Sequence, residues 1–316
     1  MSSPKRTSRL PGVPGLQLRR KEDALERVEG KLGALRLLVA NEMELVEGTL
    51  VAGERITLVP ESASLRPTTE IYYLLSGRLT QIGAPAGARP MGPGDYLVTR
   101  GLERESIFSA LEDVKFLYFT SRPFFHEISA KLQELMRLAV EVEVADGYTA
   151  EHCHRLMRLS FATGQQLGLD SHQLRLLDRA AYLHDVGKAR VPVGILQKPT
   201  SLTVEEWAVV KRHPTFGREM LEPTFVREAG PIVEQHHERM DGSGYPFGLA
   251  GDEILPESYI VAIADAYDAM TTDRVYRKRR PADEAEAELR RYAGTHYPHE
   301  LVAAFLSTAL PSESAR

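Results

Sequence analysis

The residues most able to do chemistry in this sequence are histidines and aspartates that occur in adjacent pairs. His184 and Asp185 end an apolar stretch in DRAAYLHDVGK, His236 and His237 stand together in PIVEQHHERMDGSGYP, and Asp265 interrupts YIVAIADAYDAMT. A charged aspartate at the end of a buried helix costs several kcal/mol unless something compensates it, and a divalent cation would. Imidazole with carboxylate suits Fe, Mn or Zn, and so rich a set suits two ions about 3.5–4 Å apart.

The full set of candidate metal ligands has seven members. A lone histidine on an apolar helix is more often a hydrogen-bonded core residue, but doublets of both kinds with an embedded Asp are hard to obtain by chance. Adjacent helical residues point about 100° apart, so one member of a pair can bridge two ions while its neighbour binds one. The candidates are His152, His184, Asp185, His213, His236, His237 and Asp265.

The elements that must position these residues are helices, and they occupy the second half of the chain. From about residue 124 onward the apolar pattern is helical, as in FHEISAKLQELMRLAVEVEV. Between about 36 and 121 the chain instead alternates short apolar runs with turn signals, for example IYYLLSGRLTQI and VKFLYFT, which predicts an all-β sandwich or barrel. We therefore expect a tail and short charged helix over 1–35, a β-barrel over 36–121, a connecting helix over 122–145 and a helical catalytic domain over 146–316.

Bulk composition narrows the class of protein. With 316 residues, two domains are the natural expectation, and no apolar run approaches the roughly 20 residues that a membrane helix needs. The basic, Ser/Pro/Gly-rich N-terminus lacks the apolar stretch of a signal peptide, which predicts a cytoplasmic location. The net charge of −5 gives no reason to expect binding to duplex nucleic acid or insertion in a membrane.

Several long motifs in the same order closely resemble those of the HD-GYP family, a branch of the HD phosphohydrolases. The resemblance runs from about 140 to 308, through DGYTAEHCHRL, AAYLHDVGK, RHPTFG, IVAIADAYDAMTTDRVYRK and the naming signature HHERMDGSGYP, His236–Pro246. It implies an all-α catalytic domain, and the seven candidates occupy its ligand positions. It also implies hydrolysis of cyclic di-GMP to linear pGpG, in some members onward to GMP, at a centre of iron or manganese.

One departure from the family motif bears on the number of ions. Members with a third metal have a Glu four residues before the first histidine, whereas this chain has Tyr148 there. We therefore predict two divalent ions, Fe or Mn, and inefficient onward hydrolysis to GMP.

Two cations would serve a phosphodiester cleavage in two ways. They would lower the pKa of a bridging water, which then attacks as hydroxide, and they would bind a nonbridging phosphate oxygen. We predict catalytic roles for Asp185, which would bridge the ions, and Lys188, whose ammonium would reach the scissile phosphate.

Substrate contacts are predicted for Lys188, Tyr245, Arg274 and Arg277. Tyr245 follows Gly242 and Gly244, which permit a tight backbone, and offers a ring for base stacking or a hydroxyl for phosphate. Arg274 and Arg277 are one helical turn apart and could contact a guanine edge or the second phosphate. Alternatively, both arginines belong to a solvated helix end and do not contact the substrate.

The β-rich stretch resembles a cupin-like small barrel in PTTEIYYLLSGRLTQI and ARPMGPGDYLV, without the histidines of metal-binding cupins. We expect a sensory or dimerisation domain with an unknown ligand, or a barrel that only aids solubility. For the whole chain the alternatives are a cyclic-dinucleotide receptor or scaffold without turnover, and the same chemistry on cyclic GMP-AMP. The sequence does not determine the native metal, whether a homodimer forms, or the physiological output.

Overall fold

The computed structural model describes residues 8–9, 17–18, 24–30, 33–40, 43–60, 68–85, 87–121, 125–145, 151–273 and 278–309. The chain divides into two compact units, Met1–Ala130 and Lys131–Arg316. The division falls within the helix that follows the last strand. Each unit is described by itself.

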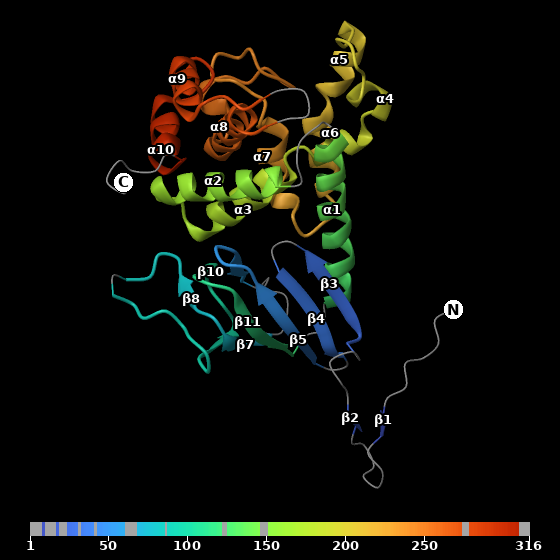
Figure 1. Cartoon of the computed structure of the whole chain (residues 1–316), viewed down its shortest axis with the longest axis vertical. Coiled ribbons are helices and arrows are strands. Elements are labelled where there is room, and N and C mark those ends of the chain that lie inside the picture. Colours follow the sequence, from blue (N-terminus) through green and yellow to red (C-terminus); the bar gives the residue numbers. More distant parts are fainter. Residues whose placement is uncertain are drawn as a thin grey trace. The chain divides into compact units, whose positions relative to one another are not determined.

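The first unit is built from antiparallel strands (Figure 1). One sheet has the order β3 (Glu26–Gly30), β4 (Gly33–Ala40), β5 (Glu44–Leu50), β11 (Val114–Thr120), β7 (Thr69–Ser76) and β9 (Tyr96–Arg100). A second has the order β6 (Arg55–Leu58), β10 (Ser106–Ala110) and β8 (Leu79–Gln81), and β1 (Ser8–Arg9) pairs with β2 (Gln17–Leu18). The predicted all-β fold is confirmed.

The core of this unit follows from strict alternation along its strands. In β11, Val114, Phe116, Tyr118 and Thr120 are buried while the residues between them are half-exposed, which is the period of a strand with one face on the core. Val114, Phe116 and Tyr118 pack with Leu74 and other apolar residues from both sheets.

The expectation of a short charged helix before residue 36 is wrong for the residues described there. Residues 26–30 form β3, which pairs with β4 in the register Gly30 to Gly33. β3 is the outermost strand of its sheet, where solvent reaches charged side chains. The charge of Arg27, which is exposed, therefore does not exclude a strand, and the pairing with β4 decides the outcome.

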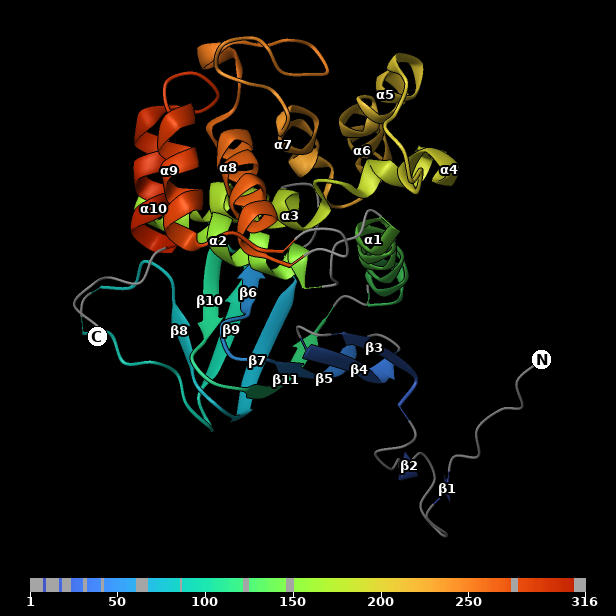
Figure 2. The ribbon, with the colours of Figure 1, turned by 45° about the horizontal axis from the view of Figure 1, so that its top comes forward.

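The second unit is helical, as predicted. Its elements are α1 (Phe125–Ala145), α2 (His152–Gln166), α3 (Ser171–Leu183), η2 (Val186–Arg190), α4 (Val193–Leu196), α5 (Val204–Val210), α6 (His213–Leu221), η3 (Arg227–Ala229), α7 (Gly230–Gln235), η4 (Gly251–Glu253), α8 (Pro256–Thr271), α9 (Ala282–Tyr292) and α10 (His299–Ala309). Helices α2 and α3 pack side by side, and α8, α9 and α10 gather together (Figure 2). Among the described helices, none is long and apolar enough to cross a membrane.

Two of these helices begin at residues whose side chains cap the first turn. Asp170 caps α3 and Thr203 caps α5, each accepting a hydrogen bond from the backbone N–H three residues on. In return, the backbone N–H of each cap residue donates to the side chain of Gln173 or Glu206. Leu177, Ile260 and Phe305, from three different helices, are completely or almost completely buried. Buried side chains thus hold α3, α8 and α10 in the core of this unit.

Candidate metal centre

Six of the seven predicted ligands lie at or beside a helix end. His152 begins α2, His213 begins α6, and His184 and Asp185 form the step between α3 and η2. His236 and His237 follow the last residue of α7. Asp265 differs because it lies within α8. Side chains at helix ends can converge from several directions, which is how residues more than 100 positions apart meet.

A close approach between η2 and α6 brings Asp185 to His213. A Cβ on Gly187 would lie 2.0 Å from the His213 carbonyl oxygen and 2.4 Å from the Gly217 nitrogen. Only glycine lets these two backbones pack so closely. Gly187 is thus a packing contact between η2 and α6, four residues beyond the end of α3 at Leu183.

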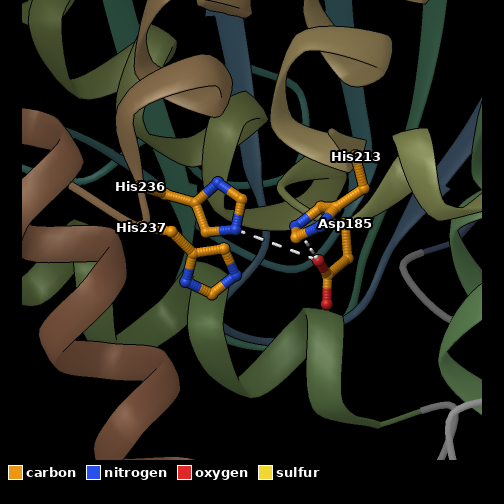
Figure 3. A group of neighbouring side chains, drawn as sticks. All are labelled: Asp185, His213, His236 and His237. Carbon is orange, nitrogen blue, oxygen red and sulfur yellow. Dashed lines mark ion pairs between the residues drawn. The ribbon is translucent and has the colours of Figure 1, made fainter. Parts of the chain in front are cut away.

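Asp185, His213, His236 and His237 form one cluster of potential ligands (Figure 3). One ligand atom from each lies within 4.8 Å of all the others. Asp185 Oδ1 is 3.0 Å from His213 Nε2 and 3.8 Å from His236 Nε2. Four side chains from three separate segments thus surround one position.

A second cluster consists of Glu143, His152 and His184. Asp185 connects the two clusters, because its Oδ2 lies 3.3 Å from His184 Nε2 while its Oδ1 faces His213. Asp265 Oδ1 lies 3.6 Å from His152 Nε2. All seven predicted ligands therefore meet in one region, and the carboxylate of Asp185 has one oxygen toward each cluster.

Three of the histidines are held in the same way. His184, His213 and His236 each place Nδ1 within 3.1 Å of the backbone carbonyl three residues earlier, at distances of 3.1, 2.8 and 2.6 Å. A carbonyl only accepts, so Nδ1 carries the proton and Nε2 keeps its lone pair. That is the tautomer that a metal ion requires.

His152 is oriented by side chains that the sequence analysis did not single out. Its Nδ1 lies 2.7 Å from Asp268 Oδ2, and Arg155 donates two hydrogen bonds to the same carboxylate. The Arg155 and His152 contacts outweigh burial and lower the pKa of Asp268 to about 2. Asp268 follows Asp265 by three residues in a helix, so the shared face was a usable signal.

Glu143 was also missed by the sequence analysis. Its VEVEV surroundings look like a charged helix surface, yet the side chain is only 1% exposed. Burial, then the neighbouring charge of Asp185, raises its pKa to about 7. No feature of the local sequence distinguishes Glu143 from the exposed Glu141.

The electrostatics of the centre favour a bound cation. Burial alone would lower the pKa of His184, but the charges of Asp185 and Glu143 raise it to about 10. Burial opposes ionisation of Asp185 too, yet Lys188 and His184 hold its pKa well below the usual range. Burial lowers the pKa of His236 and His237 well below the ordinary value, so both are neutral donors.

Several buried nitrogen and oxygen atoms that could bind a metal lack a hydrogen-bond partner among the described residues. They are the Nε2 atoms of His184, His213 and His236, with Asp185 Oδ1, Asp265 Oδ1 and Glu143 Oε2. A buried polar atom without a partner costs about 1–3 kcal/mol. Six such atoms directed into one region fit divalent metal ions.

A cavity of about 380 Å³ opens beside the clusters. Asp185, His213, His237 and Asp265 line it, together with Lys188, whose Nζ donates to Asp185 Oδ2 at 2.7 Å. Trp207, Tyr245 and Lys198 also line it. The cavity thus joins potential metal ligands to aromatic rings and ammonium groups.

The loop carrying Tyr245 is held by Glu238. The Glu238 carboxylate accepts hydrogen bonds from the backbone N–H groups of Phe247 and Leu249, at 2.7 and 3.0 Å. A Cβ on Gly244 would come within 2.6 Å of three backbone atoms of residues 237–239. The Tyr245 ring lies 4.7 Å from that of His237 and 6.2 Å from that of Trp207.

Two further predictions lie outside the described residues. The predicted substrate contacts Arg274 and Arg277 are there, as is Tyr148, on which the expected number of ions rests.

Comparison with known proteins agrees with this geometry. The HD domain family model matches residues 131–301, more than half of the chain. The "Cyclic di-GMP phosphodiesterase response regulator RpfG" of Xanthomonas campestris is 39% identical over 57% of this chain and 49% of its own length. The "3'3'-cGAMP-specific phosphodiesterase 2" of Vibrio cholerae is 35% identical over 52% of this chain and 32% of its own.

The chain belongs to the HD domain family. Its His236–Pro246 segment carries the HD-GYP signature. The chain spans half or less of the length of these two curated relatives. The first unit is similar to a solved RmlC-like cupin protein from Desulfovibrio desulfuricans, with 22% identity over 33% of this chain and 96% of that one and a TM-score of 0.24.

Proposed function

We propose that this protein is a metal-dependent phosphodiesterase that opens cyclic di-GMP to linear pGpG. The observation that carries the proposal is the convergence of seven predicted ligands from five separate segments, with the Nε2 atoms of three buried histidines and the oxygens of Asp185 and Asp265 directed at one another. The names of the relatives supply the substrate class.

Two divalent ions, Fe or Mn, would be held by His152, His184, Asp185, His213, His236, His237 and Asp265, and would supply an activated water and charge neutralisation at phosphorus. Asp185 would bridge the ions, a role supported by the way its two oxygens face different clusters. Its contact with Lys188 keeps the carboxylate ionised. The Asp185 carboxylate is thereby available to bind a cation near neutral pH.

Lys188 and Tyr245 are proposed to contact the substrate. The Lys188 ammonium lies in the cavity wall beside Asp185, where it would meet the anionic phosphate. Tyr245 and Trp207 offer two rings at the cavity, and a base that enters it would stack on one of them. Arg274 and Arg277 stay predicted contacts to a guanine edge or the second phosphate.

Cyclic GMP-AMP is the second candidate substrate. It is favoured by the name of the Vibrio cholerae relative, which matches a similar share of this chain. Both substrates present the same phosphodiester, so the metal centre does not distinguish them. The cytoplasmic location, a homodimer and a ligand of the first unit stay predictions.

The test is turnover by the anaerobically purified full chain loaded with Fe(II) or Mn(II). We expect cyclic di-GMP to yield pGpG, and Asp185→Ala to lose both bound metal and turnover while the β unit stays folded. Competition between cyclic di-GMP and cyclic GMP-AMP in one assay identifies the preferred substrate. Metal-loaded protein that binds cyclic di-GMP without cleaving it would be a receptor, and the proposal would be wrong.

A further inference from the structure

Glu143 occupies an unusual position for a glutamate in helix α1. Its side chain is 1% exposed, whereas Glu141 and Val144 on either side of this turn are exposed. Glu141 forms an ordinary surface pair with Arg137 at 2.7 Å. The helix therefore turns an apolar residue, Val144, to solvent and a carboxylate to the interior.

The Glu143 carboxylate faces two imidazole nitrogens without bonding to either. Its Oε2 is 3.6 Å from His152 Nε2, and its Oε1 is 3.9 Å from His184 Nε2. Both distances exceed a hydrogen bond. Oε2 is fully buried and has no hydrogen-bond partner among the residues that the structure describes.

These separations match ligands around a shared ion. Imidazole nitrogens and carboxylate oxygens that each lie about 2.0–2.2 Å from one ion are separated from one another by about 3–4 Å. Asp265 Oδ1, also 3.6 Å from His152 Nε2, has the same spacing. A direct contact would have brought the atoms closer, and an apolar environment would have left the carboxylate uncompensated.

We propose that Glu143 is a metal ligand, shared with His152 and His184, and that it fastens helix α1 to the helical unit through the ion. This rests on the metal centre of the proposed function. Glu143 lies nine residues before His152, ahead of the motif DGYTAEHCHRL, and it is not among the seven predicted ligands. One of the ions then takes a donor from the helix that follows the last β-strand.

The consequence is a coupling between α1 and metal affinity. Strand β11 ends at Thr120 and α1 begins at Phe125, so the first unit is joined in the chain to the helix that carries Glu143. An event that shifts α1 changes the affinity for the ion, and by thermodynamic reciprocity the ion stabilises the docked position of α1. The first unit thus has a route to the metal centre through a single carboxylate.

The test compares Glu143→Gln with Glu141→Gln in the full-length protein. Glutamine keeps the shape of Glu143 and removes its charge, and Glu141→Gln removes the same charge from the exposed face of the same helix. Ions per chain and Mn(II) affinity are measured by equilibrium dialysis and elemental analysis, and amide hydrogen exchange is followed over residues 134–145.

In wild type and Glu141→Gln, Mn(II) at 100 times its Kd should slow exchange in this stretch by up to about 100-fold. In Glu143→Gln the affinity of the weaker site should fall at least about tenfold, and metal should no longer slow exchange. Far-UV circular dichroism establishes that the variant is folded.

The proposal is overturned if Glu143→Gln binds Mn(II) as wild type does, or if metal slows α1 exchange equally in both. Failure of the proposed function gives a different result. In that case wild-type protein would bind no metal at all, or would bind it without hydrolysing any cyclic dinucleotide.

Discussion

At the residue scale, the metal centre depends on which nitrogen of each histidine is free. Backbone carbonyls fix Nδ1 of His184, His213 and His236, while a side-chain carboxylate fixes that of His152. A backbone carbonyl cannot be removed by substitution, but Asp268 can. His152 is therefore the ligand whose orientation is open to mutational test.

Asp268→Asn should weaken metal binding by about 10–100-fold, because the partner that orients His152 and raises its basicity is lost. Metal titration with a competing chelator measures the effect. Asp283→Asn, which changes an exposed carboxylate in the first turn of α9, is the control. Equal affinities in the two variants would show that His152 needs no such support.

Trp207 is the single tryptophan of the sequence and lines the cavity with 43% exposure. Binding of a non-hydrolysable phosphorothioate analogue of cyclic di-GMP should cover the indole and change its fluorescence. The titration should saturate and should be reversed by excess cyclic di-GMP. Unchanged emission despite binding detected by calorimetry would place the bases elsewhere.

At the element scale, the important contact is between η2 and α6. Gly187→Ala would put a methyl group 2.0 Å from the His213 carbonyl, so the two elements must separate. We expect a loss of about 1–3 kcal/mol in the free energy of unfolding and a larger loss of metal affinity, because Asp185 and His213 move apart. Urea denaturation and metal titration measure the two effects.

Gly194→Ala provides the matched control for this substitution. Gly194 lies in α4, where an added Cβ has nothing within 4 Å. Alanine should leave stability unchanged or raise it by up to about 1 kcal/mol. If both glycine variants behave alike, the tight packing at Gly187 does not hold the site together.

At the scale of the whole molecule, bound metal should stabilise the helical unit selectively. The proposed ligands come from α2, the α3–η2 step, α6, the end of α7 and α8, so an ion would connect most of that unit. An ion at 100 times its Kd would contribute about 2.7 kcal/mol. Chelation should therefore lower the unfolding temperature of the helical transition. The β-sheet transition should stay in place, and Asp185→Ala should respond to neither metal nor chelator. A shift in the β transition alone would contradict this.

The division into an all-β and an all-α part could be predicted from the sequence alone, as could all seven proposed ligands. Period-two runs such as VKFLYFT and long motifs such as HHERMDGSGYP are local properties, so a single sequence displays them. The error at β3 came from the same reliance on local pattern, since Glu26 and Arg27 are placed by a partner strand and not by their neighbours.

The sequence by itself determined the chemistry, because the residue types and the order of the motifs define a set of imidazole and carboxylate donors. Only the tertiary structure decided how these donors divide into two clusters, that Asp185 faces both, that Asp268 contacts His152 and that Glu143 faces it. The physical reason is that burial is a property of three-dimensional packing. Glu141 and Glu143 have nearly identical neighbours along the chain, and only the contacts of the folded helix turn one to solvent and the other toward His152.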